Sequence, residues 1–240
     1  MFKIYPIESG SKGNMYIIEN EDNAFIIDCG VPFNLIYQSS KNVPKSVIKK
    51  IKFVAITHEH SDHIKNINDL IHLDYPIYCS QGTADAIVKI KELDFNYNQL
   101  ENEKEIVIKN IEITPLDVKH DTNEPLGFYF KDLNDDDTIL FLTDIGEVPY
   151  LPKNYNKLIL EINHDLSIVN QEDKEFYKRG FDNHLSLNQA LNFFDMYKPK
   201  LDELYIIHLS QRFSNPHDIK DKLVKRGYNP HVLAQNGKEY

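Results

Sequence analysis

The sequence has few cysteines and no long apolar run. Cys29 and Cys79 are its only cysteines, far apart and outside any Cys-x-x-Cys pair, so we expect no disulfide framework. No apolar run approaches the roughly 20 residues that span a bilayer, and residues 1–6 lack the charged and apolar regions of a signal peptide. We therefore expect a cytoplasmic protein that does not act at a membrane, which argues against a secreted antibiotic-degrading enzyme.

Positive charge is also scarce. The formal net charge is −10, and the only arginines are Arg179, Arg212 and Arg226. Proteins that hold long nucleic acids display basic surfaces, so this balance argues against tight binding of long DNA. It does not exclude phosphate chemistry, because divalent ions would make an active-site cleft locally positive. The most acidic run, residues 132–137, is interpreted as a solvated hairpin turn.

The length and composition favour a folded domain. With 240 residues, 41% hydrophobic and 27% charged, we expect one domain over residues 1–240 with strands in hairpins and then strands alternating with helices. The predicted strands are Lys3–Ile7, Met15–Glu19, Ala24–Asp28, Phe53–Ile56, Pro76–Cys79, Glu105–Ile108, Ile111–Thr114, Gly127–Lys131, Thr138–Leu142, Lys157–Ile162, Leu204–Ile207 and His231–Leu233. The predicted helices are Asn34–Ile51 (with an interruption at Pro44), Ile64–His72, Thr83–Leu93, Ser186–Tyr197 and Pro216–Arg226.

Potential metal ligands crowd one stretch, residues 57–63, which directly follows the strand predicted at Phe53–Ile56. His58 and His60 are two residues apart, so in an extended segment both side chains point the same way. Histidine nitrogens and carboxylate oxygens are ligands that zinc takes. The alternative is a polar loop that merely caps the next helix, but four ligands this close favour a metal site. The candidate ligands are His58, His60, Asp62 and His63.

Three more candidates follow later strands: His120, Asp144 and His208. A His-x-His-x-Asp-His motif after an apolar strand, followed in order by His, Asp and His, resembles the signature of the metallo-β-lactamase fold superfamily. The resemblance implies an α/β fold, a four-layer αβ/βα sandwich, and two divalent ions, Zn²⁺ or alternatively Mn²⁺. It implies one ion at His58, His60 and His120, a second at Asp62, His63 and His208, and Asp144 between the two.

Other segments are similar to the YycJ/WalJ-like branch of this superfamily. Ser9–Asn14 is similar to the Ser-Gly-Ser-x-Gly-Asn opening of that branch, and His120–Gly127 to its His-Asp-x-x-Glu-Pro-x-Gly segment. His164 lies in a matching Glu-x-Asn-His-Asp segment, where it would orient substrate or serve structure. Asp28 matches a superfamily position that supports the metal loop without binding the ion. Arg212 stands where the branch has another sequence and is a candidate phosphate contact.

His184 bears on the kind of hydrolysis. The element His184-x-Ser186 resembles one that nucleases of the tRNase Z kind and the YycJ-like branch are taken to use for the leaving group, although Asn183 and Leu187 depart from the branch pattern. The alternative is that Ser186 simply caps a helix.

We therefore expect a dinuclear metal-dependent hydrolase that cleaves phosphodiester bonds, an exonuclease or a nucleotide phosphodiesterase. Its substrate would be a nucleic-acid end or a small nucleotide, attacked by metal-activated hydroxide, with Asp62 and His184 as catalytic residues. Two alternatives stay open: a thioester or lactam hydrolase related to the glyoxalases, and a non-catalytic binding protein on the same fold. Whether the substrate is DNA, RNA or a cyclic nucleotide also stays open, as does whether the protein forms a homo-oligomer.

Overall fold

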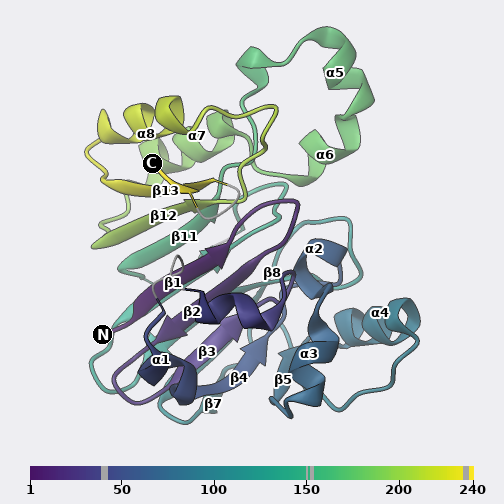
Figure 1. Cartoon of the computed structure of the whole chain (residues 1–240). Coiled ribbons are helices and arrows are strands. Elements are labelled where there is room, and N and C mark those ends of the chain that lie inside the picture. Colours follow the sequence, from purple (N-terminus) through teal and green to yellow (C-terminus); the bar gives the residue numbers. More distant parts are fainter. Residues whose placement is uncertain (39–42, 150, 152–153, 235–237) are drawn as a thin grey trace.

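The chain folds into two β-sheets that pack face to face, with helices on both outer faces (Figure 1). The computed structural model describes residues 1–38, 43–149, 151, 154–234 and 238–240. One sheet has six strands in the order β1-β2-β3-β4-β5-β6, and the other has eight in the order β14-β13-β12-β11-β10-β9-β8-β7. The expected αβ/βα sandwich is confirmed.

The strands of the first sheet are β1 (Lys3–Glu8), β2 (Met15–Glu19), β3 (Ala24–Ile27), β4 (Ile51–Ala55), β5 (Ile77–Cys79) and β6 (Asn98–Gln99). Those of the second are β7 (Ile106–Ile108), β8 (Ile111–Asp117), β9 (Leu126–Asp132), β10 (Thr138–Leu142), β11 (Lys157–Glu161), β12 (Glu203–Ile207), β13 (Pro230–Ala234) and β14 (Lys238–Glu239). Strands β10 to β13 are parallel neighbours. They read as continuous apolar runs because both faces of a parallel sheet are covered.

Three apolar clusters separate the four layers. Aromatic residues, among them Phe25, Phe53 and Phe130, fill the space between the two sheets, where Phe25 stacks on Phe53 at 4.9 Å between ring centroids. The outer face of the first sheet packs on α1 (Lys45–Lys50), α3 (Ile67–His72) and α4 (Gln81–Lys91). The outer face of the second packs on α7 (Leu187–Tyr197) and α8 (Pro216–Val224). The short helix α2 (Ser61–Ile64) follows β4.

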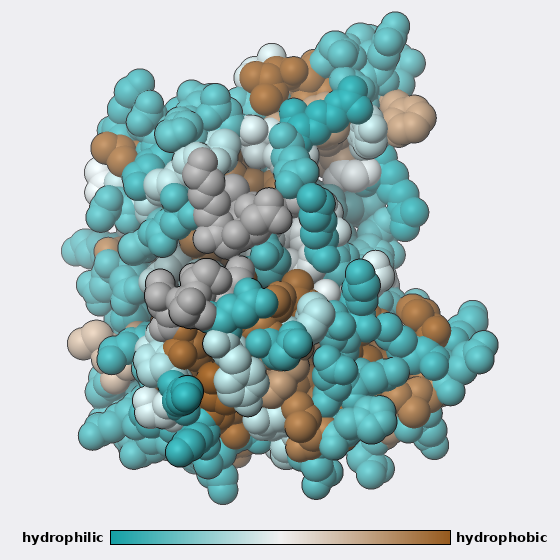
Figure 2. All heavy atoms as spheres, viewed as in Figure 1, coloured by the Kyte–Doolittle hydropathy of each residue, from teal (hydrophilic) through white to brown (hydrophobic). Residues whose placement is uncertain are grey.

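Two helices that the sequence did not predict, α5 (Gln171–Phe176) and α6 (Lys178–Asn183), project beyond the sheets (Figure 1). They are short and have no fully buried residue, so they lack the apolar stripe that marks a helix in sequence. The surface in the same view is mostly hydrophilic (Figure 2). No helix in the described part of the chain is long and apolar enough to cross a membrane.

The helix predicted over Asn34–Ile51 is wrong in its extent. A 3₁₀ helix, Phe33–Tyr37, comes first, residues 39–42 lie outside the described part, and α1 begins only after Pro44. Pro44 is extended (ψ 142°) and disfavours a helical residue before it. Ile51 is the first residue of β4 and so cannot be helical.

The hairpin turn expected at residues 132–137 is present between β9 and β10, with residues 133–136 exposed, but the two aspartates at its ends are not solvated as expected. The side chains of Asp132 and Asp137 are buried. Asp137 accepts hydrogen bonds from the backbone N–H of Phe2 (2.5 Å) and from Nζ of Lys157 (3.1 Å), whose side chain is 1% exposed. A buried carboxylate needs such partners, and they come from segments far away in sequence.

Candidate metal centre

The seven predicted ligands meet at one edge of the sandwich, where the strands of both sheets end. His58 and His60 follow β4, Asp62 and His63 lie in α2, His120 follows β8, Asp144 follows β10, and His208 follows β12. Asp144 and His208 have positive φ angles of 50° and 55° directly after their strands. Aspartate and histidine tolerate this left-handed backbone better than branched residues, and it turns the chain sharply off the strand at the ligand.

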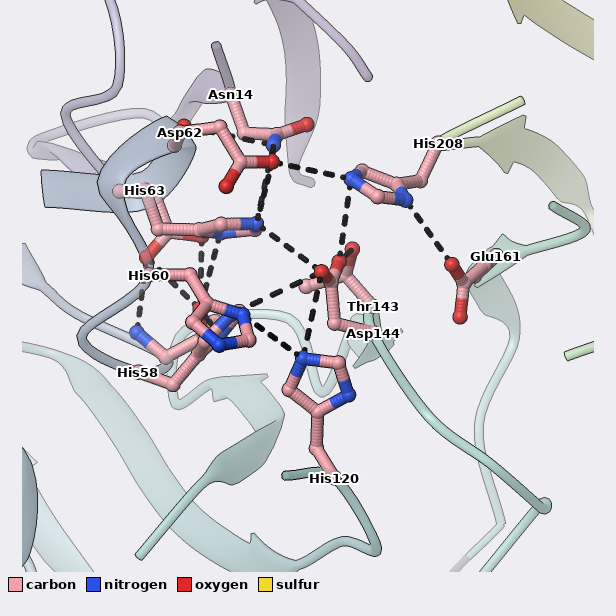
Figure 3. A network of polar contacts seen from close by, with 12 residues as sticks. Asn14, His58, His60, Asp62, His63, His120, Thr143, Asp144, Glu161 and His208 are labelled. Carbon is pink, nitrogen blue, oxygen red and sulfur yellow. Dashed lines mark hydrogen bonds and ion pairs between the residues drawn. The ribbon is translucent and has the colours of Figure 1, made fainter. Parts of the chain in front are cut away.

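Asp144 lies at the middle of the cluster (Figure 3). Its Oδ2 is 3.7 Å from Nε2 of His58, 3.4 Å from Nε2 of His63 and 3.8 Å from Nε2 of His120. Its Oδ1 is 3.5 Å from Nε2 of His208. The side chains form two groups of convergent donor atoms that share this one carboxylate. One group is His58, His60, His120 and Asp144, and the other is Asp62, His63, Asp144 and His208.

On the far side of three imidazoles, those of His58, His63 and His120, polar contacts at Nδ1 leave Nε2 facing Asp144. Nδ1 of His63 contacts Oδ2 of Asp28 at 2.8 Å, and Nδ1 of His120 contacts the carbonyl of Asn183 at 3.0 Å. Nδ1 of His58 lies 3.0 Å from Oγ1 of Thr57, whose hydroxyl also contacts Asp28. A carboxylate or carbonyl that holds one ring N–H fixes the tautomer in which the other nitrogen is a ligand.

Asp28 is fully buried, and its own backbone is left-handed (φ 60°). Its Oδ1 accepts the N–H of Thr57 at 2.8 Å. Burial raises the pKa of Asp28, although His63 and Thr57 oppose that effect. The structure thus places Asp28 on the side of the His63 ring that faces away from Asp144.

Glu161, the last residue of β11, is a site residue that the sequence analysis did not single out. Its carboxylate is fully buried and receives Nδ1 of His184 at 2.6 Å and Nδ1 of His208 at 3.0 Å on Oε1. Oε2 accepts the N–H groups of Ile145 (2.9 Å) and Leu185 (3.3 Å). Burial alone would raise its pKa, but His184 and His208 outweigh burial and hold the pKa at about 2.

His184 stands beside the two ligand groups. Its ring stacks on His208 with centroids 5.2 Å apart, and its side chain is 19% exposed. Burial lowers its pKa, but the Glu161 carboxylate more than compensates, so the pKa is raised. Asp144, Glu161, His184 and His208 form a third convergent group. Both oxygens of Glu161 already receive two donors each, so we interpret Glu161 as a support for His184 and His208.

Asn14 is a second site residue that the sequence analysis missed. Its Nδ2 lies 3.2 Å from Oδ2 of Asp62 and 3.0 Å from Nε2 of His63. Ser9 from the same loop accepts the backbone N–H of His208 at 2.8 Å. The Ser-Gly-Ser-x-Gly-Asn motif pointed to this loop in the sequence. The motif alone could not show that the loop reaches the candidate ligands.

Backbone packing sets the place of Asp62. A Cβ at Gly30 would lie 1.6 Å from the carbonyl oxygen of Asp62, so only glycine fits there. The same carbonyl accepts the N–H of Asn14 at 2.7 Å, and the N–H of Gly30 bonds to the carbonyl of Asn14 at 2.8 Å. Three segments therefore fix the start of α2.

His164 and Arg212 lie outside the two ligand groups. Both ring nitrogens of His164 are buried without a hydrogen-bond partner among the described residues, and its ring packs on Phe181 at 4.7 Å. Burial lowers the pKa of His164 to about 4. Arg212 contacts Asp173 (2.8 Å) and the hydroxyl of Tyr177 (3.0 Å), so its guanidinium joins α5 to the body of the protein.

The residues present fit metal ions. Nε2 of His58 is buried with no hydrogen-bond partner in the described part of the chain and points at Asp144. Burial lowers the pKa of His58 well below its usual value, so the imidazole stays neutral. An unpaired, neutral, buried nitrogen is costly unless an ion takes it. The cluster can therefore hold metal ions.

Comparison with known proteins agrees with this geometry. Residues 23–209 match the family described as the Beta-lactamase superfamily domain. The chain belongs to the metallo-β-lactamase fold superfamily. Within this superfamily it is 26% identical over 175 residues to Exodeoxyribonuclease YycJ of Bacillus anthracis, and 28% identical over 177 residues to Exodeoxyribonuclease WalJ of Streptococcus pneumoniae. These alignments cover 68% and 70% of the chain but 63% and 65% of the relatives, just under two thirds of their length.

Solved structures of the superfamily share the fold over the whole chain. The metallo-β-lactamase fold protein YhfI of Bacillus subtilis superimposes with a TM-score of 0.73 at 17% identity, covering 100% of this chain and 99% of its own. A diphosphatase from the PhnP family does so with a TM-score of 0.71 at 16% identity, covering 100% and 98%. At such identities the likeness shows the superfamily fold alone.

Proposed function

We propose that the chain is a dinuclear metal-dependent phosphodiesterase that acts on a nucleic-acid end or a small nucleotide. The observation that carries the proposal is the pair of ligand groups sharing Asp144, with a histidine–carboxylate pair, His184 and Glu161, beside them. The relatives' names, exodeoxyribonuclease, support a phosphodiester substrate.

In this proposal His58, His60 and His120 hold one ion, and Asp62, His63 and His208 hold the other. Asp144 serves both, because a carboxylate has two oxygens and its negative charge offsets both cations. Zinc suits this nitrogen-rich set, and manganese is the alternative that two carboxylates allow. Such ions, when bound, acidify water at neutral pH and neutralise charge that develops on a phosphoryl group.

The protein's own groups perform the remaining steps. Asp62 accepts a hydrogen bond from the attacking water and orients it. His184 carries a proton on Nε2 and donates it to the departing oxygen, while Glu161 holds the imidazole at Nδ1. General acid catalysis of this kind is typically worth about 10²–10⁴-fold in rate. A thioester or lactam substrate has a different leaving group from the alkoxide that His184 would protonate. A non-catalytic binding protein would not require the His184–Glu161 pair.

A leaving-group comparison tests the role of His184. The His184→Ala variant should lose most of its rate on a dinucleotide, whose alkoxide must be protonated, and much less on bis-p-nitrophenyl phosphate, whose phenolate leaves without a proton. Both metals should stay bound. The exposed histidine of α8 provides the control, because His217→Ala should behave as wild type on both substrates. Equal losses on the two substrates would refute the general-acid role.

Metal content tests the shared carboxylate. The purified protein should hold close to two equivalents of transition metal, and Asp144→Ala should lose occupancy at both positions. Full occupancy in that variant would refute the bridging role. Turnover of a thioester without turnover of either phosphodiester would favour the alternative hydrolase, and no turnover by the metal-loaded protein would favour a binding protein.

A further inference from the structure

A groove of about 830 Å³ lies along α7, outside the metal centre. One wall is α7, including the exposed Asn192 and Tyr197 and the buried Phe193, and the other includes Val148 and Tyr155 from the segment that leads away from Asp144. Its size falls in the usual range of ligand sites, roughly 300–1,000 Å³. Neither ligand group uses any of these residues.

One end of the groove is lined by residues that are close in sequence to residues of the metal centre. Its lining includes Glu147, three residues after Asp144, and Gln189, five residues after His184. Nε2 of Gln189 donates to the carbonyl of Gly146 at 2.9 Å, which joins the two walls at this end. The exposed pair Lys119–Glu147 (3.7 Å) lies at the same end, and Lys119 precedes the candidate ligand His120. These two contacts connect this end of the groove to the segments that carry Asp144 and His120.

The lining is aromatic and basic, unlike the chain as a whole. The ring of Tyr197 is 66% exposed and rests against Phe193 at 5.3 Å between centroids. Lys198 and Lys200 line the far end, against one acidic lining residue, Glu147, whose charge Lys119 offsets. On a chain of net charge −10 this is a local excess of positive charge. Single-stranded nucleic acids bind exposed aromatic rings through base stacking and lysines through phosphate contacts, and this groove offers one such ring, Tyr197, and two such lysines.

We propose that this groove binds the single-stranded nucleic acid that extends from the scissile phosphate. The proposal rests on the proposed phosphodiesterase function. From Gln189 to Tyr197 the helix rises about 12 Å at 1.5 Å per residue. At about 3.4 Å per stacked nucleotide this length accommodates three or four nucleotides. The groove thus specifies a short strand as the substrate and favours it over a mononucleotide.

Substitution of the exposed ring tests the groove on the metal-loaded protein. Tyr197→Ala should raise KM for a pentathymidylate about tenfold, because stacking on one aromatic ring has an effect of this order. It should leave kcat/KM for bis-p-nitrophenyl phosphate unchanged. The matched control is Tyr37→Ala, since Tyr37 is also exposed (61%) and packs on a phenylalanine four residues before it, Phe33. That variant should leave both substrates unaffected.

The lysine at the far end gives an independent measurement. Lys200→Ala should make binding of a fluorescein-labelled pentathymidylate less salt-dependent, with the slope of log K against log salt falling by about 0.7 for one lost phosphate contact. Binding of a dithymidylate, too short to reach the far end, should not change. The control is Lys174→Ala on α5, which removes one positive charge outside the groove and should leave the salt dependence of pentathymidylate binding unchanged.

The outcomes separate this proposal from the proposed function. If wild type hydrolyses bis-p-nitrophenyl phosphate but Tyr197→Ala and Tyr37→Ala bind and cleave the oligonucleotide alike, the groove proposal fails and the function stands. If wild type hydrolyses neither phosphodiester but Tyr197→Ala weakens oligonucleotide binding, the function fails and the groove stands. A change in sedimentation of Tyr197→Ala without a change in oligonucleotide binding would make the groove a contact between copies of the chain and overturn the proposal.

Discussion

Replacing Glu161 with glutamine tests how the strand β11 supports the centre. The carboxylate receives four donors, two imidazole nitrogens on Oε1 and two backbone N–H groups on Oε2. Glutamine replaces one of the two oxygens with an NH₂ group. Whichever way the amide is turned, this NH₂ group faces either the two imidazoles or the two backbone N–H groups, and neither pair can then donate to it. If the imidazoles of His184 and His208 are affected, each must give up its proton on Nδ1 to accept a hydrogen bond there, and a neutral His208 then carries its proton on Nε2. His208 would then lose the nitrogen that faces Asp62 and Asp144.

The size of the effect follows from these contacts. A hydrogen bond to a charged group contributes about 1.5–3 kcal/mol, so the loss of two should cost about 3 kcal/mol or more of the free energy of unfolding. Removing a group that orients a metal ligand typically costs about 10–100-fold in metal affinity or activity. We therefore expect Glu161→Gln to unfold at lower urea concentration, to bind the ion near His208 more weakly, and to lose about 10–100-fold in kcat/KM on bis-p-nitrophenyl phosphate.

The matched control is Glu203→Gln on the neighbouring strand β12. Glu203 sits at the opposite end of the sheet, where it contacts Lys157 (3.2 Å) and the hydroxyl of Tyr205 (2.9 Å). Its substitution should leave metal content and kcat/KM within about twofold of wild type. If Glu161→Gln keeps the same metal content and kcat/KM as Glu203→Gln, Glu161 does not support the centre.

Three further predictions concern other parts of the structure. Asp28→Asn should weaken metal binding by about 10–100-fold, measured by titration with a metal indicator, because His63 loses the carboxylate that orients it; unchanged affinity would contradict this role. Gly30→Ala should cost at least about 1–3 kcal/mol in urea unfolding, because the new methyl group meets the carbonyl of Asp62; wild-type stability would contradict it. Lys157→Met should cost about 3–5 kcal/mol at neutral pH, because it leaves Asp137 buried without its cation. Burial lowers the pKa of Lys157, but the carboxylates of Asp137 and Glu203 have the larger, opposite effect, so the pKa lies above its usual value. The stability that Lys157 contributes is therefore complete below the unfolded pKa of about 10.4 and is lost as pH rises through the folded value. The difference between wild type and Lys157→Met should then narrow above about pH 10.4, and a difference that widens there would contradict the assignment.

Most of the fold and all seven candidate ligands could be predicted from sequence because their signals are local. Buried strands such as Thr138–Leu142 are short apolar runs, and every candidate ligand lies within eight residues after the end of a strand. The shared ending of parallel strands then brings His120, Asp144 and His208 together, although 88 residues separate the first from the last. The superfamily resemblance supplied the proposed division of these candidates between two ions, which spacing alone left open.

What the sequence did not reveal depends on contacts between distant segments. Glu161 begins the Glu-x-Asn-His-Asp segment, but that match gave the glutamate no role, and only the structure brings His184 and His208 to its carboxylate. Asn14 lies 48 residues before Asp62, and Asp137 meets Phe2 across 135 residues. The α5–α6 segment has no buried face to create a periodic signal.

The division of ligands between the two sheets has a consequence for the order of folding. The first sheet and its helix supply His58, His60, Asp62 and His63, whereas the second sheet supplies His120, Asp144 and His208. Neither half has a complete set, and the shared carboxylate belongs to the later half. A chain that emerges N-terminus first exposes four ligands before their partners exist. If the two groups hold ions as proposed, stable uptake of both must wait until the sheets have packed, and the ions would then stabilise the completed assembly of the two halves.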